Sequence, residues 1–405
     1  IGPLADHLQR LLGFTDTQIG TLNAIYSLPN ILVVLLGGIL CDRIGTRLAI
    51  VWFTAICLAG AMVTAASDAF PVMAAGRLIF GIGAESMIVG ITAALGQWFV
   101  GRQLGFAFGV NLSLARAGSY AADMSPTWGK AFYDQGWQEP LFLASGLMAL
   151  GLAAAILYFV YEKFSARRYE IPRPPPPDRI VWSDLLRFDR SYWYVVGLCV
   201  TFYSVIMPFR STFAIKYFQH AHGLSLAEAG TMNGHVFLAA IFATPAFGLL
   251  IDRVGRRSLF MAGGTLLLLA TFPVLMYTQL SLWVPTVMIG IAFSLVPAVM
   301  WPSVPYLVRP NQLGTAFGLM TMIQAVGLTV CNVGAGWLND RAGASADNPD
   351  GYLPMLWMFA VMSLAGLVFA WLLRAREVGP DGHHLERVVP RSKFTAEDGG
   401  EADAR

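Results

Sequence analysis

The feature that most constrains this chain is a charged motif that occurs twice. Residues 38–47 read GILCDRIGTR, and a similar stretch, GLLIDRVGRR, begins 210 residues later and spans residues 248–257. Each copy follows a long apolar run and precedes another, so each predicts a short charged turn between two membrane-spanning helices. Two such turns in register predict two related halves.

Composition and apolar runs predict an all-α polytopic membrane protein. The chain is 56% hydrophobic and only 13% charged, which is unusual for a soluble domain. The runs long enough to cross a hydrocarbon core of roughly 30 Å are 17–40, 48–67, 70–99, 105–131, 138–161, 191–219, 227–251, 258–278, 282–308, 314–337 and 353–375. Residues 1–12 resemble the outer end of an earlier helix, so we expect two six-helix halves whose first helix is largely missing from this chain.

The same runs suggest a division of the chain. We expect an N-terminal half over residues 1–162 and a C-terminal half over residues 191–376. Between them, residues 163–190 form a linker with four consecutive prolines, whose stiffness suits a spacer. The polar residues 377–405 predict a disordered tail.

The distribution of basic residues predicts the orientation. Cytoplasmic loops retain Lys and Arg, and if both motif copies face the cytoplasm, sixteen basic residues lie on that side or its flanks against four outside. Both termini, the linker and the tail are then cytoplasmic. The chain has 23 Arg and only 4 Lys, and its only Asn-x-Ser/Thr match lies inside a span. Both features favour a bacterial inner membrane. The positive charge reflects topology, so no nucleic-acid partner is expected.

Two ionisable side chains fall near the middle of consecutive spans. Glu85 and Arg116 each lie roughly 15–20 Å from their helix ends, and charge at this depth marks a candidate functional site. A guanidinium matches a carboxylate and a carboxylate accepts from an ammonium, so the pair suits the two ends of a zwitterion. A permanent structural ion pair between them is the alternative.

Other ionisable groups lie at less central depths. Arg77 and Asp123 share an outward offset and are expected to pair with each other. Arg210 is a second anion contact or a partner in an outer gate. His235 either carries a proton or makes a local hydrogen bond. Tyr203 is one of several polar residues placed to line a cavity or to join helices.

Several blocks carry a family resemblance. Apart from the repeated charged motif, they are residues 76–86 (GRLIFGIGAES), 108–119 (FGVNLSLARAGS), 301–302 (WP) and 312–320 (QLGTAFGLM). The charged motif resembles the signature of the major facilitator superfamily, and the blocks resemble its lysosomal dipeptide transporter subfamily, of which this chain looks like a bacterial relative. The resemblance implies that Glu85 and Arg116 contact the amino and carboxyl ends of a peptide and that Trp301 lines the same cavity.

The resemblance also implies a gate at the charged motifs. Its members would pair across helices when the cytoplasmic side closes and separate when it opens, whereas the alternative reading makes them only topology determinants and helix caps. These residues are Asp42, Arg43, Arg47, Asp252, Arg253, Arg256 and Arg257.

The sequence therefore predicts a secondary active or facilitative transporter that works by alternating access on dipeptides or related zwitterions. Glu85, Asp123 and His235 are candidates for proton coupling. One alternative is an organic-anion carrier using Arg116 and Arg210, and another is a non-transporting receptor or scaffold. The sequence shows no nucleophile, metal cluster, cofactor motif or phosphate-binding G-x-x-x-x-G-K-[ST] loop, so we expect no enzyme, metal, cofactor or nucleotide. The expected partners are the substrate and membrane lipid, with a monomeric protein.

Overall fold

The computed structural model describes residues 1–31, 40–41, 43–99, 104–165, 188–309, 312–380, 382–383 and 385–386. Every regular element within these ranges is a helix. They are η1 (Gly2–Leu4), α1 (Ala5–Leu12), α2 (Asp16–Ser27), η2 (Leu28–Ile31), α4 (Thr46–Ala66), α5 (Phe70–Phe99), α6 (Leu104–Asp123), α7 (Ser125–Trp128), α8 (Lys130–Tyr133), α9 (Gln138–Ser165), α10 (Arg190–Pro208), η4 (Phe209–Phe213), α11 (Ala214–His222), α12 (Leu226–Val254), α13 (Arg257–Tyr277), α14 (Trp283–Leu307), α15 (Leu313–Ala342), η6 (Pro349–Tyr352) and α16 (Leu353–Glu377).

The predicted membrane helices are largely confirmed. Nine helices of the described ranges are long and apolar enough to cross a membrane, with α10, η4 and α11 forming one of them. The run predicted at 17–40 is represented by α2 and η2, and its residues 32–39 lie outside the described residues. The helix predicted at 105–131 is too long, because α6 ends at Asp123 and the short helices α7 and α8 follow.

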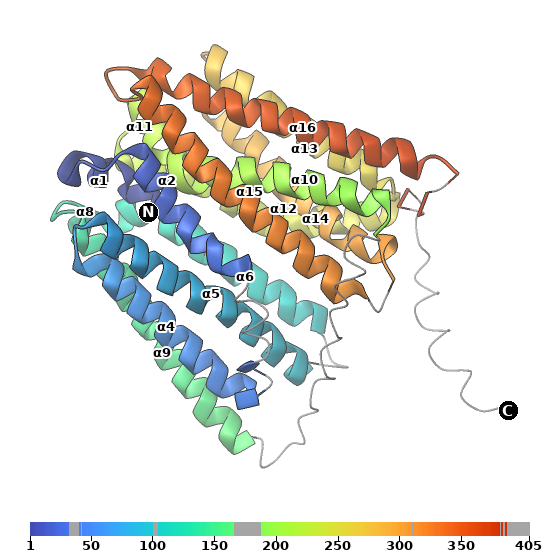
Figure 1. Cartoon of the computed structure of the whole chain (residues 1–405), viewed down its shortest axis with the longest axis horizontal. Coiled ribbons are helices and arrows are strands. Elements are labelled where there is room, and N and C mark those ends of the chain that lie inside the picture. Colours follow the sequence, from blue (N-terminus) through green and yellow to red (C-terminus); the bar gives the residue numbers. More distant parts are fainter. Residues whose placement is uncertain are drawn as a thin grey trace.

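The helices form two halves. In Figure 1 the N-terminal half (α1 to α9) lies below the C-terminal half (α10 to α16), and the helices of both halves run roughly along the same direction. The halves lie close together where α1, α8 and α11 are found. Toward the opposite end, where α4 and α13 begin, the ribbons of the two halves spread apart.

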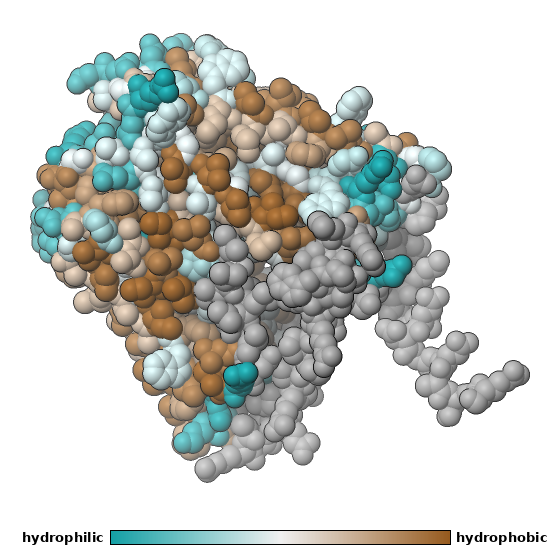
Figure 2. All heavy atoms as spheres, viewed as in Figure 1, coloured by the Kyte–Doolittle hydropathy of each residue, from teal (hydrophilic) through white to brown (hydrophobic). Residues whose placement is uncertain are grey.

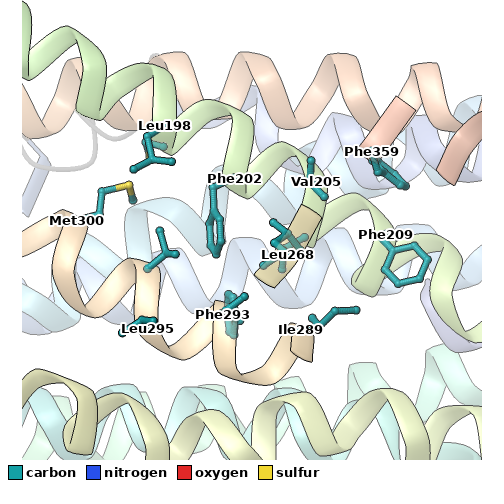
Figure 3. Close-up of a cluster of buried hydrophobic side chains, with 14 of the residues drawn as sticks. Leu198, Phe202, Val205, Phe209, Leu268, Ile289, Phe293, Leu295, Met300 and Phe359 are labelled. Carbon is teal, nitrogen blue, oxygen red and sulfur yellow. The ribbon is translucent and has the colours of Figure 1, made fainter. Parts of the chain in front are cut away.

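Among the described residues, the buried apolar clusters of the N-terminal half are smaller than the main cluster of the C-terminal half. A large cluster in the C-terminal half joins α10, α13, α14 and α16, and Figure 3 shows its side chains pointing toward one another. The ring of Phe209 lies 5.7 Å from that of Phe272 and 6.0 Å from that of Phe359. Such aromatic contacts add to the packing of buried apolar area.

The outside of the molecule is apolar, as expected of a protein in lipid. Phe242, Leu150 and Trp371 are each about two-thirds exposed or more, at 71%, 67% and 67%. In Figure 2 apolar residues cover broad areas along the helices, whereas hydrophilic residues gather toward their ends. This distribution fits a hydrocarbon layer around the helices and water beyond their ends.

The halves are joined by polar contacts at one end, which we call the closed end and define by Asp16, Asp123, Arg210, Lys216 and Asp340. Lys216 of α11 is fully buried and forms an ion pair with Asp16 at the start of α2. Asp340 of α15 accepts hydrogen bonds from the backbone amides of Asp16 (2.7 Å) and Thr17 (2.8 Å). A carboxylate from one half therefore caps a helix N-terminus of the other.

The same two helices pack very closely. A Cβ added at Gly336 of α15 would lie 2.6 Å from the carbonyl carbon of Asp16 and 2.7 Å from the amide nitrogen of Thr17. Only a glycine leaves room for α2 at this position, as at other close helix crossings. All hydrogen bonds that join the halves within the described ranges lie between the closed end and the level of Arg116.

Substitution of Gly336 tests this contact. We expect Gly336→Ala to lower the thermal unfolding midpoint in detergent, because overpacking costs about 1–3 kcal/mol. Gly334→Ala on the same helix is the control, since a Cβ there meets only the Met358 sulfur at 3.7 Å. The control should keep or raise the midpoint, because alanine favours helix. Equal effects of the two substitutions would contradict the close packing.

A pH titration tests a second contact of this end. Asp6 of α1 lies 2.9 Å from His220 Nε2 and 3.0 Å from Arg10 Nε. Burial opposes its charged form, but the His220 hydrogen bond and the Arg10 charge outweigh burial, so the pKa of Asp6 is below its ordinary value. A depressed pKa gives stability that is fully present above the ordinary pKa of about 3.9 and is lost as pH falls through the lower folded value.

We therefore expect the thermal midpoint of Asp6→Asn to lie below that of the wild type at pH 5, where the carboxylate is charged. The difference should shrink below about pH 4. Asp347→Asn, at an exposed carboxylate near the same end, is the control and should match the wild type throughout. A difference that disappears while the pH is still above 5 would argue against this assignment.

Candidate functional site

Glu85 lies in the middle of α5 and is only partly buried. The side chain of Tyr26 on α2 lies near its carboxylate. Gly81, one turn earlier on α5, makes this approach possible, because a Cβ at Gly81 would collide with the carbonyl oxygen of Tyr26. The backbone of α2 is therefore seated directly on α5 beside Glu85.

The guanidinium of Arg77 packs against the ring of Tyr26. It lies 5.2 Å from the centre of that ring, within cation–π range. It donates to the carbonyl of Leu22 (3.1 Å) and to the side-chain oxygen of Asn23 (3.1 Å). The predicted pairing of Arg77 with Asp123 is wrong, because Arg77 bonds to α2 and Asp123 forms its ion pair with Arg210.

Arg116 lies in the middle of α6 and reaches across to the other half. Its Nη1 donates to the carbonyl of Ala240 (2.6 Å) and to Oγ1 of Thr244 (2.5 Å), both on α12. Arg116 also lies 5.9 Å from the ring centre of Phe293. Both Arg116 and Glu85 are described, and they form no ion pair with each other, so the alternative of a structural pair between them does not hold in this structure.

Aromatic residues of the C-terminal half lie beside Arg116. The indole nitrogen of Trp301 on α14 donates to the hydroxyl of Tyr203 on α10 at 3.0 Å. The Trp301 ring stacks on Phe317 with centroids 5.9 Å apart, and Tyr203 lies in the neighbourhood of Arg116. The structure thus groups Arg116, Tyr203 and Trp301, three of the five residues predicted to bind substrate.

Arg210 is placed elsewhere. It lies in the π-helix η4, which follows Pro208, and a proline inside a helix removes a backbone donor and favours such an irregular turn. It is buried, forms an ion pair with Asp123 at the end of α6, and lies 3.6 Å from the ring centre of Phe237. This cross-half pair belongs to the closed end, in agreement with the gate reading of Arg210 and not with a free anion contact.

His235 makes a local hydrogen bond. Its Nδ1 lies 2.6 Å from the carbonyl of Thr231, one turn earlier on α12, and its ring meets the edge of Trp283 with centroids 4.8 Å apart. The hydrogen bond to its own helix matches the local alternative for this residue. Its predicted proton-carrying role stays a prediction.

The charged motifs lie at the end where the halves spread apart. Arg43, Arg253 and Arg256 are exposed, and Arg47 lies 5.6 Å from the ring centre of Phe159 within its own half. Arg256 has a positive φ of 50°. Asp42 and the side chain of Asp252 lie outside the described residues.

Arg257 differs from the other motif arginines in being buried. It donates to the carbonyl of Pro302 (3.2 Å) and the hydroxyl of Tyr306 (3.3 Å), both on α14. Nearby, Glu386 accepts from the backbone of Ser258 at 3.1 Å and Leu385 is buried, although both lie in the segment predicted as a disordered tail. The start of α13 is therefore anchored within the C-terminal half.

The sequence reasoning missed the closed-end group of Asp16, Lys216 and Asp340. A signal was available for Lys216, because a lysine inside a long apolar segment is costly without a partner. Asp16 and Asp340 sit at helix ends, where carboxylates are common, so nothing in the sequence joined them. Within the described residues, no group of three or more His, Cys, Asp and Glu side chains is placed to hold a metal ion.

Comparison with known proteins agrees with this architecture. The family model described as Major Facilitator Superfamily matches residues 1–213 and 200–396. The chain is 31% identical over 334 residues to the lysosomal dipeptide transporter MFSD1 of Danio rerio, covering 80% of this chain and 72% of the relative. It is 28% identical over 410 residues to the Homo sapiens protein of the same name, covering 97% and 85%.

The fold is also that of a solved transporter. The crystal structure of the nucleoside transporter NupG superimposes with a TM-score of 0.74 at 13% identity, covering 92% of this chain and 94% of that one. The resemblance to lysosomal dipeptide transporters and the two-half helical fold are therefore confirmed. The chain belongs to the Major Facilitator Superfamily and is a membrane transporter, not an enzyme.

Proposed function

We propose that this transporter carries dipeptides or related zwitterions by alternating access, with Glu85 binding the amino end and Arg116 the carboxyl end. The observation that carries the proposal is that these two opposite charges lie in the middle of consecutive long helices and do not pair with each other. A relative that is 31% identical is named a lysosomal dipeptide transporter, which supports the same cargo.

The chemistry of the two residues supports this assignment. Glu85 is partly accessible and forms no ion pair with any described residue, so its carboxylate is free to meet an ammonium. Arg116 uses one nitrogen on neutral acceptors of α12, and the rest of its guanidinium fork is left for a carboxylate. Tyr203 and Trp301 would then contact the body of the substrate.

An anion carrier is the alternative. Among the relatives, a probable sulfoacetate transporter of Cupriavidus necator is 23% identical over 369 residues. Such a carrier would use Arg116 with Arg210, but Arg210 is buried and already paired with Asp123 in this structure. The availability of Glu85 and the engagement of Arg210 both favour a substrate with a cationic end.

The cycle and the orientation complete the proposal. We place the signature motifs, both termini, the linker and the tail in the cytoplasm of a bacterial cell, with the closed end outside. The charged motifs, including Asp42 and Asp252, would pair when the halves close on the cytoplasmic side. Transport is either facilitative or proton-coupled, and Glu85 is the best candidate for the proton because Asp123 is held by Arg210.

Ligand stabilisation tests the cargo. Free dipeptides should raise the thermal midpoint of the purified protein, because a ligand that binds only the folded state stabilises it. Dipeptides blocked at either end should not. Glu85→Gln removes the charge that an ammonium needs, which should weaken binding about 10- to 100-fold. Glu139→Gln, a carboxylate outside the site at the start of α9, should behave as the wild type.

The opposite result identifies the anion carrier. If simple carboxylates or sulfonates stabilise the protein whether or not an amine is present, and Glu85→Gln has no effect, then the zwitterion assignment is wrong. Arg116 alone would then be the residue expected to bind the anion.

Cysteine labelling tests the orientation. The four native cysteines are buried, so added ones report their own positions. In intact bacteria a membrane-impermeant maleimide should label Ala346→Cys, which is exposed near the closed end. It should label Arg253→Cys, exposed in the second motif, only after the cells are opened. Labelling in the reverse order would invert the proposed topology.

A further inference from the structure

The two copies of the charged motif differ in their backbone where the following helix begins. In the first copy Gly45 has a positive φ of 84°, and the next residue, Thr46, is already the first residue of α4. In the second copy Gly255 and Arg256 both have a positive φ, so α13 begins one residue later, at Arg257. A positive φ is uncommon for a residue with a side chain. The second copy is therefore held in a strained turn that the first copy does not adopt.

The partners of the second turn come from the tail of the chain. The amide of Arg256 donates to the carbonyl of Glu386 at 3.2 Å, and the amide of Arg257 donates to the carbonyl of Leu385 at 3.3 Å. The Glu386 carboxylate accepts from the amide of Ser258 at 3.1 Å and from its hydroxyl. Arg256 gives α13 no side-chain cap. Two tail residues thus satisfy three consecutive amides at the start of this helix.

Charge and burial both favour this attachment. The N-terminus of a helix carries partial positive charge, which stabilises an acidic side chain beside it. Arg374 of α16 adds a second attraction, because its Nη1 lies 3.3 Å from the Glu386 carboxylate. Leu385 is fully buried in the large cluster of the C-terminal half. An apolar anchor and a charged cap therefore fix the tail against the second motif.

The tail folds back over the end of α16 before it reaches this position. The amide of His383 donates to the carboxylate of Glu377 at 2.7 Å, and its Nδ1 lies 3.0 Å from the same carboxylate. Ser191 in the first turn of α10 donates its hydroxyl to Glu377 at 2.8 Å. A Cβ at Gly382 would lie 2.3 Å from the carbonyl oxygen of Glu377, so the tail passes very close to the helix end.

The first copy of the motif is held within its own half. The hydroxyl of Thr46 donates to the side-chain oxygen of Gln97, near the end of α5, at 2.9 Å. Its turn contains one residue with positive φ, the glycine that the two copies share. The motif is therefore compatible with a turn in which the helix begins one residue earlier than it does at α13.

We propose that Leu385 and Glu386 are positioning residues of the cytoplasmic gate, which lock the second motif in its strained turn. When they detach, Arg256 enters α13 as Thr46 enters α4, and its exposed side chain points in a new direction. The attached tail thus opposes the movement of the second motif toward the other half. The consequence for transport rests on the proposed function, because the gating role of the motif does, whereas the existence of two turns does not.

Hydrogen exchange tests the attachment without a substrate. In the purified full chain, Leu385→Ser should expel the tail, and the amide of Ser258 should exchange about tenfold faster, as expected for a lost hydrogen bond to a charged group. Val378→Ser changes an exposed apolar residue of the same tail and should leave this amide unchanged. If Leu385→Ser does not fold, Glu386→Gln replaces it. Unchanged exchange at Ser258 would overturn the proposal.

A matched pair of substitutions tests the two turns. Arg256→Gly and Arg256→Pro both remove the guanidinium, but glycine accepts a positive φ, whereas proline fixes φ at about −65° and suits the first position of a helix. Leu385→Ser should lower the thermal midpoint in the Arg256→Gly background. It should have little effect in the Arg256→Pro background, where the tail has already lost its place. Equal losses in both backgrounds would overturn the coupling of tail and turn.

Transport separates a role in the gate from a role in stability alone. Leu385→Ser should raise the maximal rate of dipeptide uptake and leave the Michaelis constant unchanged, because the tail opposes a movement and lies away from the substrate site. The increase should be absent in the Arg256→Pro background. An unchanged or lower maximal rate would overturn the role in gating. If the wild type does not transport dipeptides, the proposed cargo fails, and the exchange and midpoint measurements still decide whether the tail positions the motif.

Discussion

The structure depends on how charge is accommodated where water is scarce. Each ionisable group embedded among the helices must find a partner, since an isolated charge in hydrocarbon is expensive. The protein meets this requirement in two ways. At the closed end the charges neutralise one another across the halves, as Arg210 and Asp123 do. Near the middle they are satisfied by neutral groups and keep their charge, as Arg116 does on α12.

This division suits a transporter, because the two kinds of contact have different purposes. A pair of opposite charges that joins the halves favours one arrangement of them, and it separates when that arrangement changes. A charge held by a neutral hydroxyl is ready for a ligand of opposite charge. The irregular turn η4 contributes to the first kind, since it carries Arg210 toward α6 and Thr212 toward Asn23, whose side chains lie 2.8 Å apart.

Much of the fold could be predicted from the sequence because it follows from local composition. Apolar runs and the repeated charged motif depend on neighbouring residues only, and they indicated the helices and the two halves. The site was harder, because depth along a helix does not say which way a side chain faces. Arg77 and Asp123 share a depth, yet Arg77 bonds to Asn23 and Asp123 to Arg210.

Contacts between helices that are distant in sequence could not be predicted from local sequence patterns for the same reason. Thr244 looks like any helical threonine until Arg116 is placed beside it, and Asp340 looks like an ordinary acidic residue at a helix end. The end of α6 at Asp123 was also missed, since Pro126 and Gly129 interrupt the helix within a run that is still largely apolar.

The capping of α2 by Asp340 links the first turn of this helix to the conformational state of the transporter. The Thr15 side chain accepts from the amide of Gln18 within the same helix, but the amides of Asp16 and Thr17 depend on a carboxylate of the other half. The first turn of α2 is therefore complete only while the two halves are joined. When the halves separate at the closed end, the amides of Asp16 and Thr17 lose the carboxylate that accepts from them. The rate at which these two amides exchange hydrogen with solvent therefore reports which side of the membrane is open.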